Sequence, residues 1–542
     1  MSRLSHRSPP SRRPTSSLRI QSAPTKPSKT RGESMFNFKK LVVAGALLLS
    51  VSTPALAAKD LVVGVPDNLT GLDPHNVNDT LSQSATRLIL QGLFGFDKDM
   101  KLVPVLAESY EANPNATEFT IHLRKNVKFH DGTSFNAQAV KINFERLSNP
   151  ENRLSRASLV NMVSQFTVVD DSTIRLILKE PFGAMINNLA HPGAMLHSPA
   201  ALEKYGKEVM RNPVGTGPYK FVSWQADTLK VAKNENYWKQ GLPKVDSVTL
   251  RSVPENGSRL AMLQAGEAQF IYPLPPEMAS VAEKSPKLDT ISKPSIVTWY
   301  VAMNNLKKPF DDIRVRQALN YAVDKRAYAK IVYNGNMDPM DSVVPPGLPF
   351  YAKQGEWPFD VAKAKELLKE AGYPDGFETE IFAGNNTTSI RAMQFLQQQL
   401  AQVNVKLKVT PLEAGVAAQK IWGVSKPEDT TVQLYYGGWS ASTGDTDWQM
   451  RPLLFGESFP PKMFNVAYFS NPDVDAGIKA GIATADNEKR AEAYKTAQEA
   501  AWKNVPWIYL GVERLLAAKS KSLSGAYYLP DRGILLEEAE LN

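Results

Sequence analysis

Apolar and polar residues alternate with two different periods along the chain, and the changes of period mark its organisation. An apolar stripe at helical spacing predicts an amphipathic helix over residues 80–91. Between about 102 and 181 the period shortens to two residues, as in 119–123 and 172–178, with one helix predicted over 136–147. This block predicts a small α+β domain with a mostly antiparallel sheet.

From about 305 to 510, helical and strand patterns follow one another and predict an α/β lobe. Its helices are expected over 312–323, 361–371 and 390–403, and the strand 405–409 follows the last of them. The final strand patterns, 507–510 and 527–529, lie far along the chain from the start of this lobe. We therefore expect the chain to cross back toward its N-terminal part.

The stretch 432–448 combines a strand pattern, two glycines and a loop of small polar, acidic and aromatic residues. Gly437 and Gly438 let a backbone or a ligand approach closely. Flat apolar walls beside a few polar groups are typical of a small-molecule pocket. The alternative is a strand end followed by a helix N-cap at Thr443 or Asp445, with the helix starting near Trp448.

The N-terminal region resembles a secretory signal. Residues 35–57 start at Met35 and contain a Lys-Lys pair, an apolar core of 11 residues at 41–51, and small residues before Ala58. This core is too short for a permanent membrane span, which needs about 20 residues. Residues 1–34 are rich in Ser, Pro and Arg, and we interpret them as a disordered extension or as part of an over-long gene model.

The balance of charged residues changes once residues 1–57 are left out. Residues 1–57 hold ten of the 63 Lys and Arg and one of the 55 Asp and Glu, which leaves 53 basic and 54 acidic residues. A near-neutral balance gives no indication of nucleic-acid binding. The chain has no cysteine, so we expect no disulfide, no thiolate nucleophile and no lipid-modified Cys.

One group of motifs carries a family resemblance. The glycine- and proline-rich joint 212–221, followed by Asn236-Tyr237-Trp238, resembles the peptide-class (family 5) substrate-binding proteins of ABC importers. Further landmarks occur in the family's order and include Leu72-Asp73-Pro74, 106–110, 129–135, 263–267, 310–319 and 362–368. The resemblance covers residues 58–542.

Shorter stretches, 78–83, 438–444 and 464–472, are most similar to the glutathione-binding branch of the family. Peptide-binding members have an aspartate for the ligand's ammonium at the position of Ser442, and the dipeptide binder has an arginine near Ala383 or Gly384. Neither charge is present here. A buried, unpaired ligand charge costs several kcal/mol, so this pocket is poorly suited to ordinary peptide ends.

The resemblance implies an α/β, two-lobed periplasmic binding protein fold (class II, cluster C) with an extra α+β domain inserted in the first lobe. Lobe I would comprise 58–90, 211–305 and 511–542, the inserted domain 91–210, and lobe II 306–510. Ligand would be held in the interlobe cleft by β-strand addition and hinge closure.

Carried over by position, the resemblance implies two ligand-binding edges. The residues expected to bind ligand at these edges are Asn78, Asp79, Thr80, Gly438, Trp439, Ser440 and Ser442. Asp445 and Asp447 are displaced candidates for the ammonium, with helix capping as the alternative. Arg87 and Arg391 are candidates for the carboxylates, and Tyr300 and Asn304 for lining the cleft near the hinge.

Other functions have weaker motifs. The histidines lie outside recognised zinc spacings, the glycine-rich joint lacks the P-loop Lys-Ser/Thr, and no nucleophile elbow occurs. We expect a monomeric periplasmic binding protein, not an enzyme, without metal or cofactor, that delivers glutathione or a related short peptide to a membrane permease with its ATPase. Binding of di- or oligopeptides, or of nickel or haem with His75 as anchor, is the alternative within the family, and a periplasmic hydrolase the alternative outside it.

Overall fold

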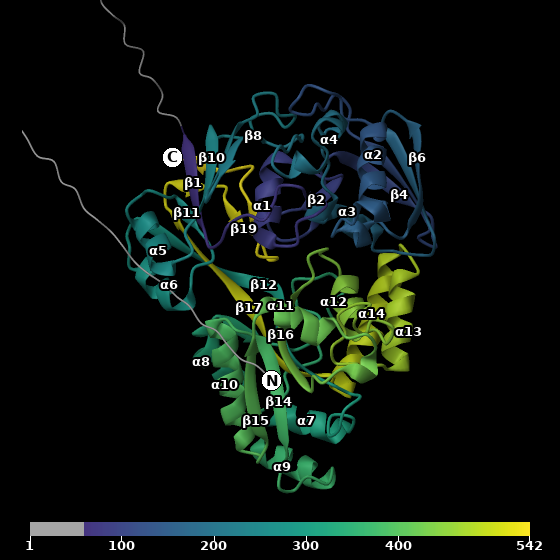
Figure 1. Cartoon of the computed structure of the whole chain (residues 1–542), viewed down its shortest axis with the longest axis vertical. Coiled ribbons are helices and arrows are strands. Elements are labelled where there is room, and N and C mark those ends of the chain that lie inside the picture. Colours follow the sequence, from purple (N-terminus) through teal and green to yellow (C-terminus); the bar gives the residue numbers. More distant parts are fainter. Residues whose placement is uncertain (1–58) are drawn as a thin grey trace, which may run out of the picture. The chain divides into compact units, whose positions relative to one another are not determined.

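One mixed sheet of eleven strands runs through the computed structural model, which describes residues 59–542 (Figure 1). The strand order is β15-β14-β16-β12-β17-β11-β1-β10-β9-β8, with β13 paired to β17. The strands are β1 (Asp60–Val65), β8 (Tyr219–Gln225), β9 (Thr228–Lys233), β10 (Ser247–Ser252), β11 (Phe270–Ile271), β12 (Leu288–Met303), β13 (Met337–Pro339), β14 (Glu378–Gly384), β15 (Lys406–Leu412), β16 (Leu434–Ser440) and β17 (Trp507–Ser520). The predicted signal segment 35–57 and residues 1–34 lie outside the described residues.

Two long antiparallel strands, β12 and β17, connect the two ends of this sheet. The first half of β12 pairs with the second half of β17, which also pairs with β11. The second half of β12 pairs with β16 and with the start of β17. We call the part around β1 and β8–β11 the first lobe, and the part around β14–β16 the second lobe.

The first lobe packs helix α1 (Thr80–Ile89) against its sheet, close to the predicted 80–91. Asp79 caps the helix by accepting a hydrogen bond from the Ser82 backbone N–H at 2.7 Å. The glycine-rich joint then passes directly over the last turn of α1. A Cβ on Gly217 would lie 2.6 Å from the Ile89 carbonyl oxygen, so only glycine fits there.

Residues 91–210, which we call the insert, carry a separate antiparallel sheet of order β4-β5-β7-β6. The α+β pattern predicted for 102–181 is therefore confirmed. The insert's elements are β2 (Phe94–Phe96), β3 (Leu102–Pro104), β4 (Ala107–Ala112), β5 (Glu118–Leu123), α2 (Ala137–Ser148), β6 (Val163–Asp170), β7 (Thr173–Leu178), α3 (Met185–Ala190) and α4 (Pro199–Tyr205).

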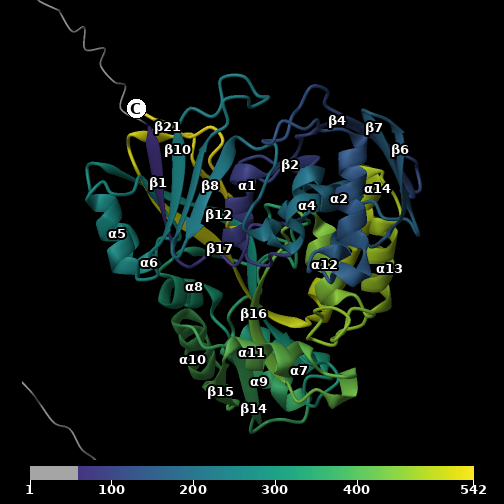
Figure 2. The same ribbon diagram turned by 45° about the horizontal axis from the view of Figure 1, so that its top comes forward.

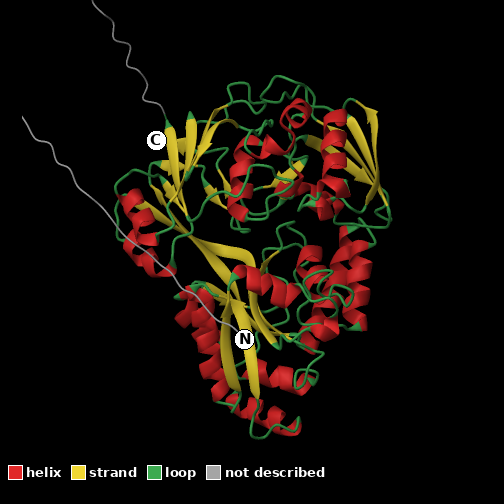
Figure 3. Cartoon of the chain, viewed as in Figure 1, coloured by secondary structure: helices red, strands yellow, loops and turns green. Residues whose placement is uncertain are grey.

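Helices flank the parallel strands β14, β15 and β16 of the second lobe (Figure 3). The remaining helices are α5 (Asn256–Gln264), α6 (Pro276–Glu283), α7 (Ile313–Tyr321), α8 (Lys325–Tyr333), α9 (Val361–Glu370), α10 (Thr387–Ala401), α11 (Ala414–Ala417), α12 (Thr446–Leu454), α13 (Pro472–Ile482) and α14 (Asn487–Asn504). The three helices and the strand predicted from the α/β pattern correspond to α7, α9, α10 and β15.

The second lobe and the insert meet directly, and α13 lies beside the insert in both views (Figures 1 and 2). The Gly183 N–H donates to the Ile482 carbonyl at 2.7 Å, and the Thr484 hydroxyl donates to the Pro114 carbonyl at 3.2 Å. The largest group of buried apolar side chains accordingly runs from the insert into the second lobe, whereas a separate group fills the first lobe.

A buried polar cluster holds the segment before α1 against the insert. Arg146 of α2 donates to Asp73 at 2.6 Å and to His75 Nδ1 at 2.7 Å, and His197 Nε2 lies 3.5 Å from Asp73. Burial is the main cause that lowers the pKa of His75, to about 3. Burial likewise lowers the pKa of His130, whose Nε2 lies 3.0 Å from the Gly217 carbonyl oxygen, to about 4.

Acid should therefore destabilise the fold over a defined range. An unfolded histidine has a pKa of about 6.5, so between pH 6.5 and about 4 the unfolded chain binds protons that the folded chain excludes, and the free energy of unfolding falls as pH falls. We expect calorimetric melting temperatures to drop across this range.

Substitution at single histidines tests the cause. His130→Gln should flatten part of the slope, whereas His122→Gln, at a more exposed position, should not. A melting temperature that stays constant from pH 7 to pH 4 would contradict this account.

Candidate ligand-binding site

A pocket of about 460 Å³ lies where β12 and β17 pass from one lobe to the other, and we call it the hinge pocket. Its volume falls in the usual range for small-molecule sites. Its walls come from both lobes and from the two connecting strands. They consist of Asn256, Pro273, Leu274, Pro275, Pro276, Glu277, Trp299, Val332, Tyr333, Asn336, Asn386, Thr387, Thr388, Arg391, Glu513, Arg514, Leu516, Tyr528 and Arg532.

Cations outnumber anions in the hinge pocket, which holds Arg391, Arg514 and Arg532 but only Glu277 and Glu513. Arg532 forms an ion pair with Glu513. Burial opposes the charge of Arg532, but attraction to Glu513, the hydrogen bond to it and the nearby Tyr528 and Tyr333 together outweigh burial and raise the pKa of the guanidinium. The pocket therefore favours a ligand with an excess of negative charge.

Of these three cations, Arg391 has the weakest contacts within the described part of the protein. Arg514 pairs with Asp338 at 2.9 Å, whereas Arg391, within residues 59–542, makes only a long contact of 3.4 Å to the Val332 carbonyl oxygen. It lies in the second turn of α10, whose N-cap Asn386 also lines the pocket. Because a helix N-terminus carries partial positive charge, an anion bound here would be stabilised both by the N-terminus of α10 and by the Arg391 guanidinium.

The indole of Trp299 forms one wall of the hinge pocket, and Gly438 of β16 leaves room for it. Gly438 pairs with Trp299 across the strands, and a Cβ on Gly438 would lie 3.0 Å from the indole ring. The indole therefore lies flat, stacked on Tyr436 at 5.2 Å, and its Nε1–H donates to Glu513 at 2.9 Å. Strand β16 continues through both glycines to Ser440.

The predicted edge residues of the second lobe lie at the end of β16. The Trp439 indole N–H donates to the Trp448 carbonyl at 2.7 Å, and its ring packs on Phe464 at 5.3 Å. The Ser440 hydroxyl is buried and has no hydrogen-bond partner among residues 59–542. The Ser442 Oγ lies 3.2 Å from His191 Nε2 of the insert.

At the predicted edge of the first lobe, the Asp79 carboxylate is used within the protein. Its Oδ1 accepts from the Ser82 N–H, and its Oδ2 accepts from the Thr70 hydroxyl at 2.5 Å. Asn78 is exposed and Thr80 is half-buried as the first residue of α1.

Asp445 and Asp447 are buried and paired. Asp445 caps α12 by accepting from the Asp447 N–H at 2.8 Å, which confirms the capping alternative for this residue, and it also pairs with Arg490 at 2.8 Å. Asp447 pairs with Arg451 at 2.7 Å. Both carboxylates fix the start of α12 through these contacts.

Tyr300 and Asn304 lie in the interior. Tyr300 is 3% exposed and stacks on Trp507 at 4.1 Å. Asn304 is fully buried, and its side-chain amide donates to the Val432 carbonyl at 2.7 Å. Both side chains hold neighbouring strands of the second lobe together.

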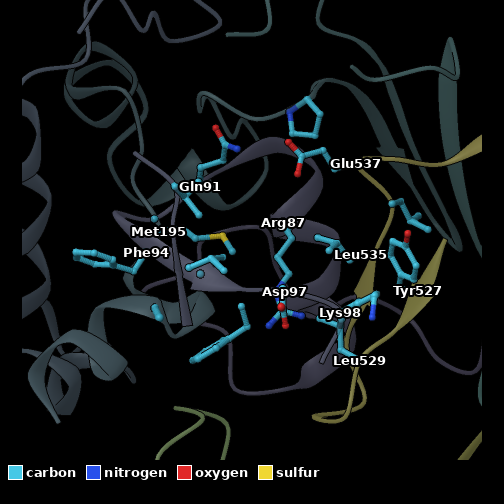
Figure 4. Close-up of a pocket in the computed structure, with 18 of the residues that line it drawn as sticks. Arg87, Gln91, Phe94, Asp97, Lys98, Met195, Tyr527, Leu529, Leu535 and Glu537 are labelled. Atoms are coloured by element: carbon cyan, nitrogen blue, oxygen red, sulfur yellow. The ribbon is translucent and has the colours of Figure 1, made fainter. Parts of the chain in front are cut away.

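Arg87 lines a second pocket, of about 330 Å³, between the first lobe and the insert (Figure 4). It pairs with Asp531 at 3.0 Å and lies with Asp97 and Lys98 beside the C-terminal segment that carries Leu529 and Leu535. Its charged lining balances, with the cations Arg87, Lys98 and Lys239 and the anions Asp97, Glu537 and Glu538, so it lacks the excess of positive charge of the hinge pocket.

Sequence reasoning missed Arg532, Glu513 and Arg514. These residues lie in the last strand and the C-terminal segment, far along the chain from Trp299 and α10. The one local indication in the sequence is the turn pattern Pro530-Asp531-Arg532-Gly533, and in the structure Arg532 adopts a positive φ of 71° there.

His75, the anchor expected for the nickel or haem alternative, is fully buried, with its Nε2 3.0 Å from the Met195 carbonyl oxygen. Among residues 59–542, no group of three or more His, Asp or Glu side chains has a geometry suited to a metal ion.

The buried Asp445–Arg490 pair gives a direct test of what Asp445 does. Asp445→Ala should lower the free energy of unfolding by about 3–5 kcal/mol, because it leaves a buried guanidinium unpaired and removes a helix cap. Asp429→Ala, at an exposed position, should change it by less than about 0.5 kcal/mol. Urea denaturation measures both. An Asp445→Ala protein as stable as the wild type, with weakened ligand binding, would favour ligand contact.

Comparison with known proteins places these features in a family. The model of the bacterial extracellular solute-binding proteins, family 5 (middle region), matches residues 101–460. The chain is 50% identical over 503 residues to the glutathione-binding protein GsiB of Pectobacterium atrosepticum, covering 92% of this chain and 98% of that protein. It is 47% identical over 505 residues to GsiB of Salmonella typhimurium, with 93% and 98% covered.

A solved structure has the same two-lobed architecture. The periplasmic binding protein DppA of Helicobacter pylori, in complex with the peptide STSA, superposes with a TM-score of 0.75 at 26% identity and covers 89% of this chain and 98% of that chain. The resemblance and the fold class predicted from the sequence are both confirmed. The chain belongs to the bacterial extracellular solute-binding proteins of family 5.

Proposed function

We propose that the protein is the periplasmic solute-binding component of an ABC importer that captures glutathione between its lobes and delivers it to the membrane permease. The observation that carries this proposal is the 46–50% identity to glutathione-binding proteins over 98% of their length. At this identity we expect the chain and those glutathione-binding proteins to share the fold and the residues that line the pocket.

The hinge pocket supports this ligand class by its charge. Glutathione carries two carboxylates and one ammonium, so its net charge is negative. Arg391 and Arg532 provide two guanidinium groups, and the guanidinium fork matches a carboxylate in geometry. Glu513 provides an acidic partner for the ammonium, and Trp299 a flat apolar wall.

Binding between lobes gives a mechanism for delivery. The hinge strands β12 and β17 are the connection about which the lobes would close on the ligand. We propose that strand β16 and residues 78–80 contact the peptide backbone from opposite sides, and that Gly438, Trp439, Ser440 and Ser442 form the second-lobe edge. We do not include Asp445, Asp447, Tyr300 and Asn304 in the site, because their side chains are used within the protein.

We further propose export through the predicted signal at 35–57 and, because the chain lacks cysteine, no lipid anchor. Among residues 59–542, no helix is long and apolar enough to cross a membrane. Within the importer, the partners would be the permease and its ATPase, and we expect a monomer without catalytic activity.

Titration calorimetry on the purified protein tests the ligand. We expect binding of glutathione, with dipeptides such as Met-Leu and nickel giving weaker binding or none. The oxidised form should be titrated in parallel. A protein that binds a plain dipeptide tightly and gives no heat with either form of glutathione would contradict the proposal and favour the peptide-binding alternative.

Arg391 offers a test of the pocket. Arg391→Gln should weaken glutathione binding about tenfold or more, which is the scale of a hydrogen bond to a charged group. Arg326→Gln is a matched control, because Arg326 lies on α8 of the same lobe and pairs at the surface with Glu356. Equal affinities for Arg391→Gln and the control would place the ligand outside the hinge pocket.

A further inference from the structure

Arg156 of the insert lies against the segment that precedes α1. The Arg156 backbone N–H donates to the His75 carbonyl at 3.1 Å, and its side-chain Nε–H donates to the Val77 carbonyl at 2.9 Å. These two bonds fix the guanidinium beside the segment that carries Asn78 and Asp79, the predicted ligand edge of the first lobe.

The charge of Arg156 is not neutralised within the protein. Among residues 59–542 it forms no ion pair, whereas Arg87 pairs with Asp531 at 3.0 Å and Arg146 with Asp73 at 2.6 Å. Asp79 attracts Arg156, but both of its carboxylate oxygens already accept hydrogen bonds. Burial lowers the pKa of Arg156. A half-buried cation without a partner is costly, so its position calls for an external anion.

The surroundings of Arg156 reach the end of strand β16 through His191. A Cβ on Gly193 would lie 2.9 Å from Arg156 Cγ and 3.0 Å from His191 Nδ1, so the two side chains meet over this glycine. The Gly193 N–H donates to His191 Nδ1 at 2.9 Å, which leaves the ring proton of the neutral form on Nε2 to donate to Ser442.

The charged groups that act most on His191 are cations. Burial, and then the charges of Arg156 and Arg87, hold the pKa of His191 well below its usual value. The ring is therefore neutral, and Ser442 contributes no negative charge. Arg87 already pairs with Asp531, and both oxygens of Asp79 accept hydrogen bonds within the protein, so a ligand carboxylate would bind to the guanidinium of Arg156.

We propose that Arg156 binds a carboxylate of the ligand and thereby sets specificity for peptides that carry a carboxylate at this end of the cleft. The inference rests on the proposed function, since it assigns one carboxylate of a doubly carboxylated peptide to the insert. The other carboxylate then belongs to Arg391 or Arg532 in the hinge pocket. An ordinary peptide with its ammonium at this end is disfavoured by the same charges.

Calorimetric titration of the purified wild type, Arg156→Gln and Arg153→Gln with three probes tests this. The probes are glutathione and two analogues in which one or the other carboxylate is converted to an amide. Arg153 is exposed, lies three residues away and makes no ion pair within residues 59–542, so its variant is a matched control. Melting temperatures of all three proteins report on folding.

We expect Arg156→Gln to weaken glutathione binding about tenfold or more, with the control unchanged. The analogue that lacks the carboxylate bound by Arg156 should bind wild type and Arg156→Gln equally, whereas the other analogue should still distinguish them. Arg156→Lys, which keeps the charge but loses the fork, should fall between.

Two negative results have different meanings. If wild type and Arg156→Gln bind glutathione equally well, Arg156 does not contact a carboxylate and the inference is wrong. The inference is also wrong if Arg156→Gln weakens the binding of both analogues to the same extent. If wild type binds none of the probes, the proposed function fails and the inference falls with it.

Discussion

The antiparallel pairing of β12 with β17 is the interaction on which both lobes and the candidate site depend. Together these strands join the two parts of the large sheet, because β12 pairs with β16 of the second lobe and β17 pairs with β11 of the first lobe. Because each backbone hydrogen bond of the pairing also fixes register, Trp299 is placed opposite Gly438 on one side and beside Glu513 on the other. The hinge pocket is therefore a consequence of the connection between the lobes.

Charge compensation explains how the pocket selects its ligand. Most cations near the cleft have a partner within the protein: Arg490 has Asp445, Arg451 has Asp447 and Arg87 has Asp531. Arg391 and Arg156 have none among the described residues. One lies in the second lobe and one in the insert, so the unmet positive charge is divided between the two sides of the cleft. A ligand with a carboxylate at each end satisfies both.

Local features of the fold were predictable from the sequence, because they depend on neighbouring residues. The helices α1, α7 and α9 follow from apolar periodicity and caps, and the loop after β16 itself offers Asp445 as a helix cap. The length of β12 was not predictable, because its first half, 288–294, is polar and contains Pro294. It is a strand because β17 pairs with it. The contacts of Arg532 and Arg156 depend on residues far away in sequence, so no local pattern reveals them.

The central claim is that glutathione lies against Trp299 in the hinge pocket, with its carboxylates shared between the second lobe and the insert. A crystal structure of the protein with bound glutathione tests this most directly. We expect ligand density over the Trp299 indole, one carboxylate within hydrogen-bond distance of Arg391 or Arg532, and the other at Arg156. Density in the pocket between the first lobe and the insert, beside Arg87, Phe94 and Leu535, with the hinge pocket empty, would be the contradictory result.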